Sequence, residues 1–188
     1  MDFETYKNLV SKYYRYDCRE LNFQNRIIIP FLEGLFCGKY DVVDSSTLFK
    51  NWKKINRDQF AGNYTPDILV VDNWRLFDEK KKKPLLIIEV KRPTANDRYH
   101  AEAEVEEYLN KSHYVILTDC ITWEISEKGR KDPINYFLAK DNQMVCERNA
   151  SNNEDERIIN WIDTNTTNNA WIKLCNKLET ITNERISK

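Results

Sequence analysis

Three side chains on two neighbouring predicted strands form the combination in this sequence with the clearest potential for chemistry. Asp67 follows Pro66 at the start of "DILVVD", and Glu89 and Lys91 end the apolar run "LLIIEVKRP". Because side chains alternate along a strand, Glu89 and Lys91 leave the sheet on the same face. An isolated charge in a strand that is buried on both faces costs on the order of several kcal/mol. We therefore expect a compensating group beside them.

The two apolar runs at 66–74 and 84–92 predict an antiparallel hairpin, which brings Asp67 across from the end of the second run. Two adjacent carboxylates repel each other unless a cation lies between them, and oxygen ligands at this density suit Mg²⁺, for which Mn²⁺ would substitute. Such an ion lowers the pKa of a bound water and neutralises charge on a phosphate, while Lys91 would orient or help deprotonate that water. The residues predict phosphodiester hydrolysis.

The order Pro66-Asp67 and then Glu89-Val90-Lys91 resembles the PD-(D/E)xK signature of the restriction-endonuclease-like nucleases, with a variable spacer between the two strands. The resemblance implies an α/β fold, a restriction-endonuclease-like core with a central mixed β-sheet flanked by helices. It also implies an Mg²⁺-dependent endonuclease that acts on DNA, with Asp67, Glu89 and Lys91 as catalytic residues. Asp67, Glu89 and Val90 are then candidate metal-binding positions.

An N-terminal segment resembles the nuclease domain of type I restriction enzyme R subunits, where a glutamate precedes a proline by ten residues. Glu20 and Pro30 in "ELNFQNRIIIPFL" have that separation. Glu20 is therefore a further candidate catalytic acid and metal ligand, and its alternative is an exposed acid on an amphipathic helix. Gln24 lies one helical turn further on the same face and is a candidate nucleic-acid contact.

Two later segments resemble the same family. A predicted helix at 95–112 keeps the tyrosine of the family's Gln-x-x-x-Tyr motif as Tyr108, a candidate nucleic-acid contact, but has Glu104 in place of the glutamine. Glu104 either approaches the site or is solvated. The stretch "YVILTDCITWEI" is similar to the paired strands that follow, with Cys120 in place of a turn glycine. The resemblance covers residues 20–125 in the family's order, and residues 131–188 carry no assignable motif.

Basic residues concentrate in the middle of the chain. Residues 50–92 contain eleven Lys and Arg against six Asp and Glu, whereas the whole chain has a net charge of −1, so the remaining residues sum to −6. A basic segment in an acidic frame is consistent with a local site for a polyanion. Lys53, Lys54 and Arg92 are candidate phosphate contacts, although each taken alone is more often an ordinary surface residue.

The chain predicts a single nuclease-like domain over residues 1–188, with a core at about 15–130 and with extra strands and C-terminal helices at 131–188. We predict helices at 2–14, 19–36 (kinked or broken at Pro30 and stopped by Gly38), 95–112, 152–163 and 168–186. We predict strands at 40–49, 66–74 and 84–92, two short strands around Asp119 and Cys120, and a hairpin at 134–147.

Composition excludes several classes of protein. No apolar run reaches the roughly 20 residues that span a bilayer, and the acidic, amphipathic N-terminus is unlike a signal peptide. Five widely spaced cysteines fit neither a disulfide framework nor a zinc site. We expect a cytoplasmic protein without a membrane partner.

Several alternatives stay open. Glu89 and Lys91 are an ordinary ion pair at a strand end in the purely structural interpretation, in which Asp67 is a turn residue. The nuclease hypothesis places the protein in restriction, anti-phage defence or mobile-element DNA processing. Its competitors are a non-cleaving nucleic-acid-binding or assembly module of the same fold, and an RNA nuclease. A homodimer, and a separate motor or methyltransferase subunit, are the partners we expect of a nuclease.

Overall fold

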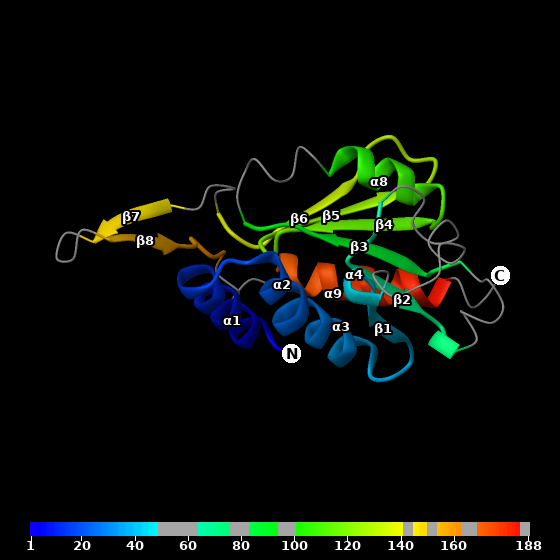
Figure 1. The fold of residues 1–188 in the computed structure, drawn as a ribbon, viewed down its shortest axis with the longest axis horizontal. Helices are drawn as coiled ribbons and strands as arrows, with labels where there is room; N and C mark the ends of the chain where they lie inside the picture. Colours follow the sequence, from blue (N-terminus) through cyan, green and yellow to red (C-terminus); the bar gives the residue numbers. More distant parts are fainter. Residues whose placement is uncertain are drawn as a thin grey trace.

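The computed structural model describes residues 1–48, 64–75, 83–93, 101–140, 145–149, 154–162 and 169–184. Within this part of the chain, helices flank a six-stranded mixed sheet, which confirms the predicted α/β class (Figure 1). Its strands are β1 (Asp41–Asp44), β2 (Ile68–Val71), β3 (Leu86–Val90), β4 (Tyr114–Thr118), β5 (Thr122–Glu127) and β6 (Ile134–Phe137). The helices are α1 (Phe3–Tyr16), α2 (Glu20–Phe23), the π-helical η1 (Gln24–Ile28), α3 (Ile29–Phe36), α4 (Ser45–Leu48), α8 (Glu102–Leu109) and α9 (Ala170–Glu184).

The strands lie in sequence order across the sheet, and one neighbouring pair is parallel. β1, β2 and β3 pair antiparallel, β3 and β4 pair parallel, and β4, β5 and β6 again pair antiparallel. A parallel pair needs a crossover connection, and α8 lies in the segment that joins β3 to β4. All five residues of β3 are buried, as expected for a central strand that is covered on both faces.

The two faces of the sheet pack against different helices. The larger core joins α1, η1, α3 and α9 to one face, and its strand residues include Ile68, Leu86, Ile88 and Val90. The smaller core joins α8 to the other face through Leu69, Ile87 and Tyr108, among others. Figure 1 shows α8 on one side of the sheet and α1, α3 and α9 on the other. The alternation predicted for residues 86–90 is therefore confirmed.

The second helical segment, for which we predict a kink or a break at Pro30, runs through this proline without a break. Its middle turn is π-helical, and the Ile29 N–H donates to the carbonyl oxygen of Gln24, five residues back. Proline has no N–H to donate and clashes with the preceding turn, so a wider turn just before it lets the helix continue. The helix ends as predicted before Gly38, where Cys37 and Gly38 both take a left-handed conformation.

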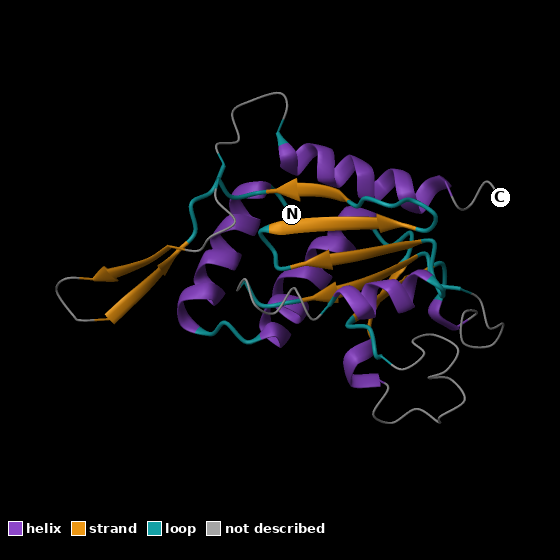
Figure 2. Cartoon of the chain, turned by 90° about the horizontal axis from the view of Figure 1, so that it is seen from above, coloured by secondary structure: helices purple, strands orange, loops and turns teal. Residues whose placement is uncertain are grey.

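Three predicted elements were wrong in detail. The strand predicted at 40–49 ends at Asp44, and α4 follows it. The predicted hairpin at 134–147 does not form, because β6 pairs with β5 instead. The predicted helix at 152–163 is wrong, since β8 (Glu154–Ile158) pairs with β7 (Val145–Asn149) in a separate hairpin (Figure 2). A run of acids resembles a helix N-terminus in sequence, but strand pairing overrides that local signal.

The turn between β4 and β5 keeps the backbone that a glycine would favour. Cys120 occupies this turn with a φ of 69°. Its N–H bonds to the Thr118 hydroxyl, and the Asp119 carboxylate accepts from the N–H groups of Ile121 and Thr122. These contacts hold Cys120 in a left-handed conformation that glycine adopts more readily.

Among the described residues, no helix has the length and apolar character needed to cross a membrane.

Candidate active site

The pairing of β2 with β3 places Asp67 opposite Glu89. Ile68 pairs with Ile88, and one further step of the antiparallel register brings Asp67 across from Glu89. The Asp67 carboxylate also contacts β3 directly, since the backbone N–H of Val90 donates to Asp67 Oδ2 over 2.8 Å. Residues of the same alternation, Leu69 and Ile87, belong to the core under α8. Both carboxylates therefore lie on the face of the sheet that α8 covers.

Lys91 completes the cluster on the same face. Its Nζ lies 2.6 Å from Glu89 Oε1, and the two side chains are 13% and 5% exposed. The Lys91 N–H donates to the carbonyl oxygen of Thr118, which fixes the chain just after β3 against β4. Tyr108 of α8 is fully buried and donates its hydroxyl proton to Glu89 Oε2 over 3.3 Å. Glu89 is thus held from two sides.

Glu104 is a member of this cluster that the sequence alone did not assign. Its Oε2 lies 3.0 Å from Lys91 Nζ, and that oxygen is buried without a hydrogen bond of good geometry. Lys91 is therefore shared between two carboxylates. The signal was present in the sequence, because Glu104 and Tyr108 are one helical turn apart and must occupy the same helix face.

Burial sets the electrostatics of the cluster. It raises the pKa of Asp67 to about 7, with the Val90 N–H opposing and the charges of Glu20 and Glu104 adding to the rise. Burial, and next the charge of Asp67, raise the pKa of Glu89 well above its ordinary value. Burial alone would lower the pKa of Lys91, but the adjacent carboxylate of Glu89 raises it instead. Without another cation, Lys91 is the positive charge that stabilises this acidic site.

Glu20 and Gln24 belong to α2 and η1, which pack on the face of the sheet opposite to α8. Glu20 is half-buried in the first turn of α2, close enough for its charge to raise the pKa of Asp67. Gln24 is 2% exposed, and its Nε2 donates to Asp67 O at 3.1 Å, Asp44 Oδ1 at 3.0 Å and Ser46 Oγ at 3.2 Å. The π-helical turn therefore positions an amide that fixes the main chain of Asp67.

The other predicted site residues occupy different environments. Lys53 and Lys54 lie outside the described residues. Arg92 is exposed and directly follows Lys91. Val90 is buried in the larger core, so only its main-chain carbonyl is chemically able to bind a metal. Buried Tyr108 and Gln24 contact site residues, and the prediction that they contact nucleic acid stays a prediction.

The donor atoms fit a divalent ion that takes few protein ligands. Among the described residues, no group of three or more His, Cys, Asp or Glu side chains is placed to hold a metal ion. Mg²⁺ commonly binds one or two carboxylates and keeps several waters, whereas a structural zinc site needs a closed set of four ligands. Asp67 and Glu89 would supply those carboxylates, with the main-chain carbonyl of Val90 as a candidate third oxygen, and a bound ion would compete with Lys91 and Tyr108 for the Glu89 oxygens.

No protein-family model matches the chain, and no curated protein does. One solved structure with a similar arrangement is described as "Characterization and crystal structure of the type IIG restriction endonuclease BpuSI", with a TM-score of 0.42 and 17% sequence identity. The match covers 86% of this chain and 17% of that one.

Proposed function

We propose that this protein is a metal-dependent endonuclease of the PD-(D/E)xK class that hydrolyses phosphodiester bonds of DNA, in restriction, anti-phage defence or mobile-element DNA processing. One observation carries the proposal: Asp67 and Glu89 oppose each other across two strands while Lys91 Nζ contacts Glu89 at 2.6 Å. A buried Glu89 beside a half-buried Asp67 and a half-buried Lys91 at one sheet end serves chemistry better than stability, because ionised groups are costly to remove from water.

The carboxylates and the lysine have different roles: the carboxylates would bind the metal ion, and Lys91 would compensate negative charge. Asp67 and Glu89 would hold Mg²⁺, with the Val90 carbonyl and Glu20 as further candidate ligands. A bound Mg²⁺ supplies a water of lowered pKa and neutralises charge on the phosphate. Lys91 places a cation beside the carboxylates, where it contacts a non-bridging phosphate oxygen and stabilises negative charge that develops during hydrolysis. Its raised pKa favours this electrostatic role over that of a general base.

The surrounding contacts keep these groups in place. Tyr108 fixes one Glu89 oxygen, the Val90 N–H fixes one Asp67 oxygen, and Gln24 fixes the Asp67 main chain. We infer that Tyr108 and Gln24 act by positioning the carboxylates. Pre-organised groups of this kind reduce the reorganisation that the reaction would otherwise require.

A second function is favoured by one feature of the same cluster. Lys91 contacts both Glu89 and Glu104, so the site has an internal cation that reduces its charge conflict without metal. A non-cleaving nucleic-acid-binding or assembly module would keep such a closed network. This alternative predicts binding without cutting at any metal concentration.

A cleavage panel tests the proposal. Purified protein is incubated with single-stranded, duplex and branched DNA and with RNA, in Mg²⁺ or Mn²⁺ and with EDTA as the metal-free control. The endonuclease proposal predicts cutting of at least one DNA substrate that EDTA stops. Cutting of RNA alone would replace DNA by RNA as the substrate class.

Three variants assign the cutting to the cluster. Asp67→Asn, Glu89→Gln and Lys91→Ala should each abolish cutting with the far-UV circular dichroism unchanged. Lys128→Ala is the matched control, because β5 runs antiparallel to β4 and so carries the exposed Lys128 to the opposite end of the sheet. Undiminished cutting by all three cluster variants would contradict the proposal.

A further inference from the structure

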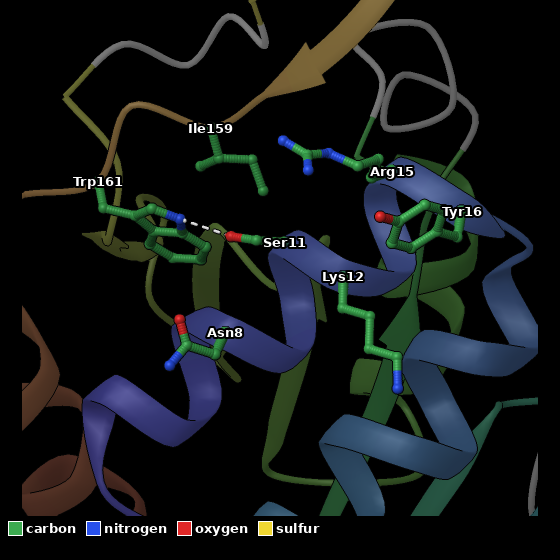
Figure 3. A pocket seen from close by; sticks show the side chains of 7 residues that line it. All are labelled: Asn8, Ser11, Lys12, Arg15, Tyr16, Ile159 and Trp161. Atoms are coloured by element: carbon green, nitrogen blue, oxygen red, sulfur yellow. Dashed lines mark hydrogen bonds between the residues drawn. The ribbon is translucent and has the colours of Figure 1, made fainter.

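A cavity of about 320 Å³ lies between α1 and the segment that follows β8. Figure 3 shows Ile159 and Trp161 on one side of it and α1 side chains on the other. Among the described residues that line it, the α1 members are Asn8, Ser11, Lys12, Arg15 and Tyr16. A cavity of this size lies at the lower end of the range that holds small ligands.

The lining of this cavity follows from the periodicity of α1. Asn8, Ser11, Lys12 and Arg15 recur at the spacing that places them on one face of a helix. The opposite face of α1 carries Phe3, Tyr6, Val10 and Tyr14, which are buried. The polar face would be an ordinary solvated surface if nothing lay against it, but residues 159–161 form a second wall.

That second wall is held rigidly. The Trp161 indole N–H donates to Ser11 Oγ over 3.0 Å, and the ring of Trp161 meets the ring of Phe3 edge-on at a centroid distance of 5.9 Å. Trp161 also forms an isolated β-bridge with Ala139, and the Ile162 N–H donates to the carbonyl oxygen of Leu138. The cavity is therefore pre-formed, which lowers the cost of ordering on binding.

The chemistry of the cavity points to one class of ligand. Lys12 and Arg15 place two positive charges at the edge of this cavity, and Lys12 Nζ lies 5.8 Å from the centroid of the Tyr13 ring. Tyr16, a large aromatic, is 75% exposed beside them. Proteins bind single-stranded nucleic acid with cations that contact the phosphates and with exposed aromatic rings on which the bases stack. A duplex base pair offers no free base face to such a ring.

A short stretch of chain links the cavity to the helix that carries Glu20. Tyr16 ends α1, and Glu20, whose charge reaches Asp67, begins α2 four residues later. Four residues span at most about 15 Å, which is the length of roughly four nucleotides at the rise of a duplex strand. Tyr16 therefore lies within about 15 Å of Glu20, which is a candidate ligand of the proposed site.

We infer that this cavity binds a nucleotide of a single strand that leads to the candidate active site, with its base on Tyr16 and its phosphates at Lys12 and Arg15. The inference rests on the proposed function for the identity of that strand. It adds a preference for unpaired nucleic acid beside the cut.

Fluorescence anisotropy with labelled oligothymidylate of about 15 nucleotides, in EDTA so that nothing is cut, tests the inference. The double variant Lys12→Ala/Arg15→Ala should weaken binding about tenfold at low salt and reduce the slope of log affinity against log salt by about 1.4. Tyr16→Ala, at an exposed position that folding does not need, should weaken binding about fivefold or more.

The matched control removes two cations elsewhere. Lys128→Ala/Arg130→Ala changes the net charge equally at exposed positions on the far end of the sheet and should leave affinity within about twofold. Equal affinities of the double variant, Tyr16→Ala and the control would overturn the inference. An oligouridylate arm reports whether the sugar matters.

The two proposals fail in distinguishable ways. If the parent cuts nothing, but variants of Lys12, Arg15 and Tyr16 bind the oligonucleotide more weakly than the parent, the cavity proposal stands and the nuclease proposal fails. If the parent cuts, but the cavity variants bind the oligonucleotide as tightly as the parent does, the nuclease proposal stands and the cavity proposal fails.

Discussion

Two charged regions of this protein differ in their exposure to solvent. The cluster of Asp67, Glu89 and Lys91 lies under α8, where Lys91 and Glu89 are 13% and 5% exposed. The α1 cavity instead presents Lys12, Arg15 and a Tyr16 that is 75% exposed. Burial in the first region shifts pKa values and fixes side chains through hydrogen bonds. Exposure in the second leaves cations able to meet a polyanion at little desolvation cost.

Buried charges suit catalysis and exposed charges suit binding, for different physical reasons. Buried charges act strongly on a nearby phosphate because little water screens them, but they reduce the stability of the empty site. Each exposed charge contributes little because water and salt screen it, so affinity depends on how many such charges contact the ligand. Variants of the first region should therefore change reaction rate and folding together, whereas variants of the second should change affinity alone.

The largest effect is expected for Lys91→Ala. It removes the cation that contacts Glu89 and Glu104 and should lower single-turnover cleavage at least about 100-fold. It should also destabilise the fold by about 3 kcal/mol, since it leaves buried carboxylates without their partner. Urea unfolding monitored by tryptophan fluorescence measures the second effect. Wild-type cleavage by this variant would remove Lys91 from the mechanism.

Neutralising a carboxylate should have the opposite effect on stability. Burial raises the pKa of Asp67 and Glu89, so each anion is disfavoured in the fold. Asp67→Asn keeps an oxygen that accepts from the Val90 N–H but removes the charge. We expect it to raise the free energy of unfolding in EDTA by on the order of 2 kcal/mol at neutral pH, less than the full shift implies because Asp67 is partly exposed, while cutting is lost. A less stable Asp67→Asn protein would contradict this account.

The same carboxylate predicts a pH dependence. The pKa of Asp67 rises from 3.8 to about 7 on folding, so between these values the native state binds more protons than the unfolded state. Stability contributed by this group therefore falls as the pH rises from about 4 to about 7 and levels off above. The difference in unfolding free energy between parent and Asp67→Asn should follow that curve in EDTA. A difference that stays constant with pH would contradict the assigned burial of this charge.

Tyr108→Phe should have the smallest effect. It removes the 3.3 Å hydrogen bond to Glu89 but keeps the buried ring. The loss should cost about 1 kcal/mol of stability and slow cleavage by about tenfold or less. A loss of cutting as complete as that of Lys91→Ala would make Tyr108 a catalytic residue and not a positioning one.

The sequence predicted the central features of the site because they follow from short-range rules. Alternation along residues 86–90 and the hairpin of β2 with β3 were enough to bring Asp67 opposite Glu89, with Lys91 beside them. The α/β class and the helix at residues 170–184 likewise follow from periodicity.

Other features depend on contacts between distant segments. Glu104 meets Lys91 because α8 packs over β3 and β4, and Gln24 is buried because a π-helical turn directs it toward Asp67. Residues 154–158 form a strand because β7 is available to pair with them. The cavity beside α1 needs Trp161, which lies 150 residues from its partner Ser11. Helical spacing places Glu104 on the same face as Tyr108, but no local pattern contains the pairings with these distant partners.

Direct binding of Mn²⁺ is the measurement that tests the central claim most closely. Electron paramagnetic resonance of free Mn²⁺ is followed during titration of the parent, of Asp67→Asn/Glu89→Gln and of the control Lys128→Ala. The account predicts that the parent and the control remove about one ion per chain from solution and that the double variant removes none. Equal binding by all three proteins, or no binding by the parent, would show that these carboxylates do not form a metal site.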